Sequence, residues 1–214
     1  MSTQPALTVG FDLDMTLIDS RPGIAAAYRS LMARTGVYID VEAAVSRLGP
    51  PLTHELANWF PLERIDEAAA IYRSLYPDEA IAPTLALPGA AEAIAAVRAA
   101  GGRVVVVTAK RAPLARLHLD HLGLAVDDLV GDLWAEGKSV ALRAHDAHVY
   151  VGDHIADMAA ARGADATGVG VTTGPCDADA LRAAGATEVL PDLRAFPAWL
   201  GSDGISVGPM STTR

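Results

Sequence analysis

The chain has little lysine, little cysteine and few aromatic residues. Its 214 residues include two lysines, Lys110 and Lys138, and every other Lys or Arg position is arginine. Where arginine serves the general surface, a remaining lysine suggests a role that needs a compact ammonium group. Cys176 is the only cysteine, which excludes an internal disulfide and a thiolate metal cluster. Aromatic content is 5% against 51% apolar, so we expect a core built of alanine, valine and leucine.

Positive charge and long hydrophobic runs are also scarce. The formal net charge of -9 argues against a nucleic-acid partner or an anionic membrane surface. No apolar run approaches the length of a membrane span, and the polar first residues do not resemble a signal peptide. We therefore expect a cytoplasmic protein with no membrane contact. The expected assembly, a monomer or a homodimer, does not follow from these features.

Strand and helix signals alternate along most of the chain, which predicts an α/β fold with a Rossmann-like parallel sheet. The expected strands are 7–11, 103–107, 129–131, 149–151, 167–171 and 188–190. The expected helices between them are 90–100, 113–122, 139–145, 157–164 and 178–184.

Residues 17–83 break this alternation. They carry helical patterns at 22–34, 41–47, 53–59 and 65–75, no convincing strand, and prolines at their far end. We interpret them as a helical cap domain inserted into a core domain of residues 1–16 and 84–200. The tail 201–214, rich in Gly, Ser and Thr, is expected to be disordered.

Polar residues follow three of the expected strands. Asp12 and Asp14 follow the first strand, Thr108 follows the second, and Asp153 and Asp157 follow the fourth. Ligands of open α/β sheets bind at the carboxyl ends of strands, so these side chains are expected to converge. Clustered carboxylates repel one another, and all-oxygen ligation suits Mg²⁺. Taken one by one, the same residues are also compatible with helix caps and ordinary strand ends.

Together these residues resemble the haloacid dehalogenase (HAD) superfamily. Residues 12–17 (Asp-Leu-Asp-Met-Thr-Leu) are similar to its first motif, Val107-Thr108 to its second and Lys138 to its third. The fourth motif is matched by 152–157. The sequences at 18–20, 49–52 and 88–89 further resemble the phosphoglycolate phosphatase branch.

The resemblance implies a Mg²⁺-dependent phosphatase of small phosphate monoesters. Asp12 would attack phosphorus to give an aspartyl-phosphate, and Asp14 would protonate the leaving oxygen and then deprotonate water. Mg²⁺ would be held by Asp12, the Asp14 backbone carbonyl and Asp153, with Asp157 supporting the metal waters or Lys138.

The same resemblance assigns the phosphate ligands. Thr108 and Lys138 would hold the equatorial oxygens, and the backbone N–H of Ala109 would bind phosphate. Arg47, just before 49–52, is our candidate for binding a substrate carboxylate from the cap, because guanidinium pairs a carboxylate bidentately.

The chain departs from the family pattern at three positions. Met15 replaces the usual glycine, and we expect a conventional turn there because methionine does not adopt φ > 0 cheaply. Ala109 replaces a frequent asparagine and loses a side-chain donor. Lys138 lacks the usual following Pro-x-Pro, which leaves Lys110 as its rival.

Three other functions remain open: a phosphosugar mutase of the β-phosphoglucomutase type, a 2-haloacid dehalogenase, and a non-catalytic binding protein on the same scaffold. Asp14 argues against the dehalogenase, because a general acid at that position belongs to phosphoryl chemistry. Among the remaining histidines, we expect His154 beside the site but not as a ligand, and His118 and His121 on the surface. Trp59, Phe60 and Tyr76 are expected in the core of the cap.

Overall fold

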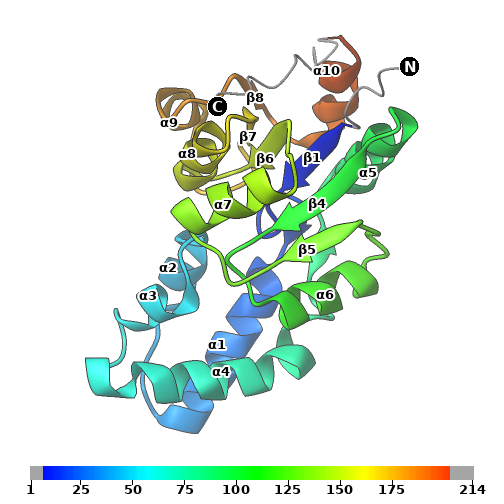
Figure 1. Cartoon of the computed structure of the whole chain (residues 1–214). Helices are drawn as coiled ribbons and strands as arrows, with labels where there is room; N and C mark the ends of the chain where they lie inside the picture. Colours follow the sequence, from blue (N-terminus) through cyan, green and yellow to red (C-terminus); the bar gives the residue numbers. More distant parts are fainter. Residues whose placement is uncertain (1–6, 203–214) are drawn as a thin grey trace.

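The computed structural model describes residues 7–202, and its centre is a six-stranded parallel sheet (Figure 1). The strand order is β5-β4-β1-β6-β7-β8. The strands are β1 (Thr8–Phe11), β4 (Arg103–Val107), β5 (Asp128–Val130), β6 (Val149–Gly152), β7 (Thr167–Val171) and β8 (Glu188–Leu190). The predicted parallel α/β sheet is thus confirmed. Its central strands are nearly continuous apolar runs because both faces are covered.

Helices cover both faces of this sheet. They are α5 (Ala90–Ala99), α6 (Ala112–His121), α7 (Glu136–Ala144), α8 (Ile155–Gly163), α9 (Ala178–Ala183), the 3₁₀ helix η2 (Leu193–Ala195) and α10 (Phe196–Ser202). One hydrophobic cluster joins α5, α6 and α10 to one face, and another joins α7 and α8 to the other. Strand β4 shows the two-residue period of a buried strand. Val104 and Val106 belong to the first cluster, and Val105 and Val107 belong to the second.

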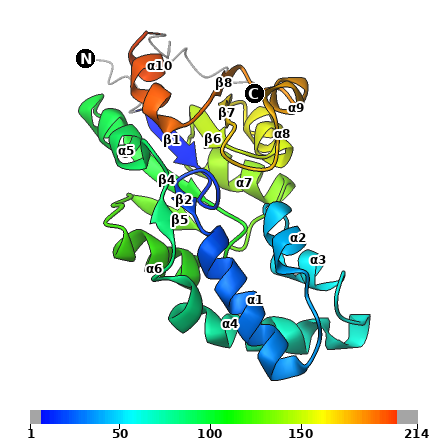
Figure 2. The same cartoon turned by 180° about the vertical axis from the view of Figure 1, so that it is seen from behind.

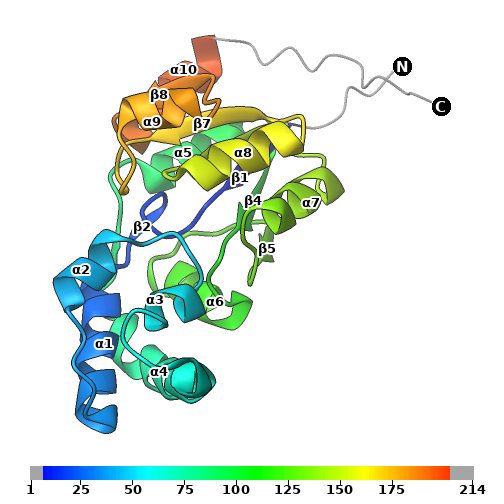
Figure 3. The same ribbon diagram turned by 90° about the vertical axis from the view of Figure 1, so that its left-hand side faces the viewer.

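The segment between β1 and β4 forms a separate helical layer. It contains α1 (Arg21–Thr35), α2 (Val41–Ser46), α3 (Leu52–Leu56), the 3₁₀ helix η1 (Leu62–Arg64) and α4 (Ile65–Ala80). In Figures 1 and 2 these helices gather beyond the sheet edge toward which the arrows of β4 and β1 point. Their buried apolar residues form a cluster of their own, with α1 packed along α4 (Figure 3). Phe60 and Tyr76 belong to that cluster and Trp59 packs against it, as expected.

A short antiparallel ribbon joins the two layers. It pairs β2 (Ile18–Asp19) with β3 (Leu85–Ala86), so the helical layer leaves and re-enters the core at one place. This ribbon was not predicted, because two-residue strands carry no periodic signal. The domain division itself stays a prediction, and the separate clusters and the single ribbon agree with it.

Helix α4 continues to Ala80, although Pro77 was expected to end it near residue 75. Proline removes one helical hydrogen bond, but Tyr72, Tyr76 and Ala80 keep a buried stripe on the side of α1. Tertiary packing therefore overrides the local signal.

At the other end of the chain, the expected disorder of 201–214 is wrong for Gly201 and Ser202, which end α10. The rest of that tail lies outside the described residues. Within residues 7–202, no helix is long and apolar enough to cross a membrane.

Candidate active site

The strand order reverses its direction at β1, which lies between β4 and β6. Such a topological switch opens a crevice at the carboxyl ends of the strands, where α/β proteins bind ligands. Asp12 directly follows β1, Thr108 follows β4 and Asp153 follows β6. The predicted convergence of these three strand ends is confirmed.

The loop after β1 is a tight turn around Met15. The backbone N–H of Met15 donates to the Ile18 carbonyl at 2.8 Å, and the Met15 carbonyl accepts from the Thr173 hydroxyl. Met15 has φ of 59°, so our expectation of a conventional turn is wrong. A side chain is tolerated in this left-handed conformation at a cost of about 1–2 kcal/mol, and burial of the methionine to 2% exposure offsets part of it.

Lys138, in the first turn of α7, binds two carboxylates. Its Nζ lies 3.1 Å from Asp12 Oδ1 and 2.7 Å from Asp157 Oδ1. The ammonium is almost completely buried, and these two partners raise its pKa despite the opposing effect of burial. The other oxygen of Asp157 accepts the backbone N–H of His154 at 3.2 Å. Asp157 therefore fixes the position of Lys138 against Asp12.

Asp153 completes a buried group of three carboxylates. One oxygen from each of Asp12, Asp153 and Asp157 lies within 4.8 Å of the others. Thr16 donates its hydroxyl to Asp153 Oδ1 at 3.0 Å, which links the loop after β1 to the end of β6. A Cβ at Gly174 would lie 1.7 Å from Asp153 Oδ2, so only glycine leaves room for this carboxylate.

These carboxylates fit a hard divalent cation. Burial raises the pKa of Asp12 to about 7, against the opposing effect of Lys138. Burial and the charges of Asp12 and Asp157 raise the pKa of Asp153 as well. Within the described chain, Asp12 Oδ1 is buried and has no hydrogen-bond donor, since Lys138 reaches it only as an ion pair. A cation with oxygen ligands, such as Mg²⁺, would satisfy this oxygen and offset the repulsion.

Lys110 occupies a different position from Lys138. Its Nζ lies 2.9 Å from Asp14 Oδ1 and donates to the Tyr76 hydroxyl at 2.7 Å. Burial opposes the charge of Asp14, but Lys110 and the hydroxyl of Ser20 outweigh burial and lower the pKa of Asp14. The two lysines thus pair with different carboxylates, and Lys138 is the one beside Asp12.

Tyr76 extends this chain of contacts to His118 on α6. The Tyr76 hydroxyl lies 3.0 Å from His118 Nε2. Because Lys110 can only donate to the Tyr76 oxygen, the phenol proton is free for His118, whose Nε2 then accepts. Our expectation of a surface position for His118 is wrong, since its exposure is 0%. The sequence carries no signal for this burial, which depends on how α4 of the cap meets α6.

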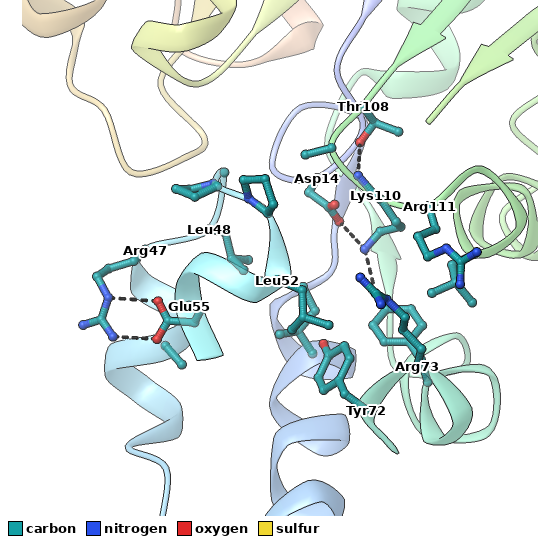
Figure 4. A pocket seen from close by; sticks show the side chains of 18 of the residues that line it. Asp14, Arg47, Leu48, Leu52, Glu55, Tyr72, Arg73, Thr108, Lys110 and Arg111 are labelled. Atoms are coloured by element: carbon teal, nitrogen blue, oxygen red, sulfur yellow. Dashed lines mark hydrogen bonds and ion pairs between the residues drawn. The ribbon is translucent and has the colours of Figure 1, made fainter. Parts of the chain in front are cut away.

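A cavity of about 190 Å³ lies between the sheet edge and the helical layer. The strand-end residues Asp12, Asp14 and Thr108 line it together with residues of α2, α3 and α4, and in Figure 4 Asp14 and Thr108 lie across the cavity from Arg47 and Glu55. Thr108 accepts the backbone N–H of Lys110 at 3.2 Å, and Ala109 also faces the cavity. The cavity therefore contains the predicted acid–base residue and the predicted phosphate ligands Thr108 and Ala109.

Arg47 lines the same cavity, but it is already paired. Its Nη2 lies 2.6 Å from Glu55 Oε1 and its Nε lies 3.2 Å from Glu55 Oε2. In Figure 4 this pair lies across the cavity from Asp14. The bidentate face that we expected to bind a substrate carboxylate is thus occupied by Glu55, and its role toward a substrate stays a prediction.

His154 caps α8. Its Nδ1 accepts the backbone N–H of Ala156 at 3.1 Å, and its ring lies 5.3 Å from that of Trp134. Burial lowers the pKa of His154, which keeps the ring neutral as an acceptor. It lies beside the carboxylates, and its Nδ1 is used by the helix cap.

The family model described as haloacid dehalogenase-like hydrolase matches residues 9–162, which span the strand ends and both lysines. The chain belongs to this family. The predicted resemblance is thereby confirmed.

Curated relatives carry different activities. The chain is 32% identical over 189 residues to the tyrosine-protein kinase PtkA of Mycobacterium tuberculosis, covering 81% of this chain and 65% of PtkA. It therefore spans less than two thirds of PtkA. It is also 32% identical over 216 residues to a phosphoglycolate phosphatase of Rhodospirillum rubrum, covering 89% of each chain.

Solved structures confirm the fold. A haloacid dehalogenase-like hydrolase from Streptococcus pneumoniae superposes with a TM-score of 0.80 at 24% identity, covering 91% of this chain and 98% of that one. At this identity the likeness concerns the fold alone.

Proposed function

We propose that this protein is a Mg²⁺-dependent phosphatase of small phosphate monoesters, with phosphoglycolate as the first candidate substrate. The observation that carries the proposal is the position of Asp12, held between Lys138 and the Asp153–Asp157 carboxylates at the mouth of a cavity. The similarity over 89% of a phosphoglycolate phosphatase supports the substrate class.

The residues divide the reaction between them. A carboxylate oxygen of Asp12 attacks phosphorus and forms a P–O bond, and the bond to the leaving oxygen breaks. Asp14 gives a proton to that oxygen and later takes one from the water that hydrolyses the aspartyl-phosphate. Lys110 holds Asp14 ionised, which suits the second step. A bound phosphate dianion adds negative charge beside Asp14, which raises the pKa of Asp14 and favours its proton uptake before the first step.

Charge at the phosphate is balanced by Lys138 and by the hydroxyl of Thr108. Asp12, Asp153 and the backbone carbonyl of Asp14 would hold Mg²⁺, and the cation would offset negative charge at the phosphate. Asp157, tied to Lys138 at 2.7 Å, acts by positioning that ammonium. Positioning and electrostatics are the main contributions a protein makes to phosphoryl transfer.

The alternatives differ in where the phosphoryl group goes. A phosphatase releases inorganic phosphate, whereas a mutase or a kinase transfers the group to an acceptor hydroxyl. A dehalogenase would need neither Mg²⁺ nor Asp14. A binding protein would bind phosphorylated compounds without releasing phosphate.

A phosphate-release screen over phosphorylated metabolites, with Mg²⁺ and with EDTA, tests the proposal. We expect release of inorganic phosphate that requires Mg²⁺ and that beryllofluoride inhibits as an analogue of the aspartyl-phosphate. Asp12→Asn should abolish turnover, because an amide is a poor nucleophile and a poorer metal ligand. Near wild-type release by that variant would exclude the covalent mechanism, and metal-independent action on halo-acids would indicate a dehalogenase.

A further inference from the structure

The charged groups of the cavity pair off, with one exception. Lys110 pairs with Asp14 at 2.9 Å, Arg47 with Glu55 at 2.6 Å and Arg111 with Asp132 at 3.6 Å. Asp12, which also lines the cavity, pairs with Lys138.

Arg73, on α4, is the exception. Among residues 7–202, no carboxylate lies within ion-pair distance of its guanidinium, and its Nε is buried without a hydrogen-bond acceptor. A buried donor without an acceptor is costly, so the position is explained if a ligand supplies the acceptor.

The direction of the side chain indicates where that ligand lies. In Figure 4 Arg73 extends from the helical layer toward Lys110 and Asp14, on the opposite side of the cavity from Arg47 and Glu55. The proposed reaction places the leaving oxygen of the substrate at Asp14. The guanidinium therefore faces the part of the substrate just beyond the leaving oxygen.

Much of the wall around Arg73 is neutral. Tyr72 and Tyr76 line the cavity on either side of Arg73 in the chain, and burial raises the pKa of both phenols, so they stay neutral. Apolar side chains of Ile24, Leu52 and Leu114 line it as well.

We propose that Arg73 selects substrates whose leaving alcohol carries an anionic oxygen group, such as a carboxylate, a short distance from the phosphate ester. Guanidinium presents two parallel N–H donors to such a group, and Lys110 adds positive charge nearby. The inference rests on the proposed phosphatase function and assigns to Arg73 the role that the sequence suggested for Arg47.

Paired substrates test the selection. Phosphate release with Mg²⁺ is measured on 2-phosphoglycolate and on p-nitrophenyl phosphate, whose leaving group has no anionic substituent. Arg73→Met, which keeps the aliphatic stem, should lower kcat/KM for 2-phosphoglycolate by roughly 10- to 100-fold. The same variant should change kcat/KM for p-nitrophenyl phosphate by less than about twofold. Arg73→Lys should recover part of the loss on 2-phosphoglycolate.

Two matched variants serve as controls. Arg29→Met removes the same charge from an exposed position on α1 and should affect neither substrate. Arg47→Met removes the paired arginine across the cavity and should not discriminate between the substrates. Equal losses on both substrates with Arg73→Met, or a selective loss with Arg47→Met instead, would overturn the proposal.

A binding measurement separates this proposal from the proposed function. Calorimetric titration in EDTA, where the proposed hydrolysis does not proceed, should show that Arg73→Met weakens binding of 2-phosphoglycolate by about tenfold and leaves binding of inorganic phosphate unchanged. That result supports the role of Arg73 even if the wild type releases no phosphate, in which case only the phosphatase function fails. Unchanged binding of 2-phosphoglycolate would refute the role of Arg73 even in an active phosphatase.

Discussion

At the scale of single residues, Asp14 combines two partners that keep it charged with a position facing the cavity. Lys110 and Ser20 bind its carboxylate, and Tyr76 orients Lys110 from the cap. The pair therefore fixes both the charge and the direction of the proposed acid–base group.

Asp14→Asn should slow turnover by at least about 100-fold, the usual size of an acid–base contribution. The amide keeps the shape of the side chain, so phosphate binding at Thr108 and Lys138 should survive. Steady-state rates and phosphate titration of the same preparation check both parts. A variant that loses phosphate binding as well would show that Asp14 mainly shapes the site.

His118 should make the stability of the protein depend on pH. Burial, helped by the charge of Lys110, lowers the pKa of His118 to about 3, whereas the pKa of a histidine in an unfolded chain lies near 6.5. Between these values the unfolded state binds one more proton. The free energy of unfolding should therefore fall as pH decreases from about 6.5, by up to roughly 1.4 kcal/mol per pH unit.

Urea denaturation at several pH values between about 6.5 and 4.5 checks this, with His118→Gln compared to wild type. The difference in the free energy of unfolding between wild type and His118→Gln should shrink as pH falls. Carboxylate titrations are common to both proteins and cancel in this difference. His54→Gln, exposed on α3, is the control and should follow wild type. Parallel pH profiles for wild type and His118→Gln would contradict the prediction.

The sequence predicts the residues at strand ends well and those at the cap interface poorly. Asp12, Thr108 and Asp153 follow apolar runs, and a parallel sheet brings such positions together whatever the details of packing. His118, Arg73 and the partner of Arg47 depend on how α4 and α3 meet the core, which no local pattern encodes. The prediction for Met15 was wrong for a different reason. Its backbone is held by hydrogen bonds to Ile18 and Thr173, and Thr173 lies far away in the sequence.

At the scale of elements, the loop after β7 limits the space around the carboxylates. It brings Gly174 against Asp153 and Thr173 against the turn of Met15. A loop without any predicted function thus supports two of the family motifs.

Gly174→Ala should displace the Asp153 carboxylate and lower Mg²⁺ affinity or kcat/KM by roughly 10- to 100-fold, as loss of supporting contacts at metal sites does. Circular dichroism should show an unchanged fold. Gly201→Ala, where a Cβ meets nothing within 4 Å, is the matched control. Equal activity of the two variants, measured across Mg²⁺ concentrations, would mean that Asp153 adjusts freely.

Some elements can be predicted from the sequence and others cannot. Strands 103–107, 167–171 and 188–190 match the observed bounds, because turn residues flank each apolar run. The end of α4 and the ribbon of β2 and β3 do not follow from local signals. Pro77 predicts the end of a helix, but packing of α4 against α1 stabilises the helix beyond this proline.

At the scale of the whole molecule, we propose that the helical layer moves as a unit about the ribbon. Both of its connections pass through β2 and β3, so rotation there would change the distance between the helical layer and Asp12 with little change in either hydrophobic cluster. Closure would exclude water and strengthen every charge interaction at the phosphate.

The carboxylate cluster should lower the stability of the metal-free protein. Asp153→Asn removes one of three buried like charges and can still accept the Thr16 hydroxyl. In EDTA at about pH 8, it should raise the free energy of unfolding by roughly 1–2 kcal/mol while abolishing the stabilisation that Mg²⁺ gives the wild type.

Asp179→Asn, at an exposed surface ion pair, is the comparison and should change stability by less than about 0.5 kcal/mol. Urea denaturation of each protein with and without Mg²⁺ provides the values. A less stable Asp153→Asn protein in EDTA would show that Lys138 already balances the cluster.

The burial of both lysines has a consequence for the chemistry of labelling. The side chains of Lys110 and Lys138 are 8% and 1% exposed, and their carboxylate partners keep both ammonium groups protonated. Free amines attack acylating reagents and protonated, buried ammonium groups do not, so the lysine side chains of the folded protein should resist acylation. Acylation of Lys110 or Lys138 would then report that the helical layer or the sheet edge has opened. Each acylation would also modify a lysine that pairs with Asp12 or Asp14.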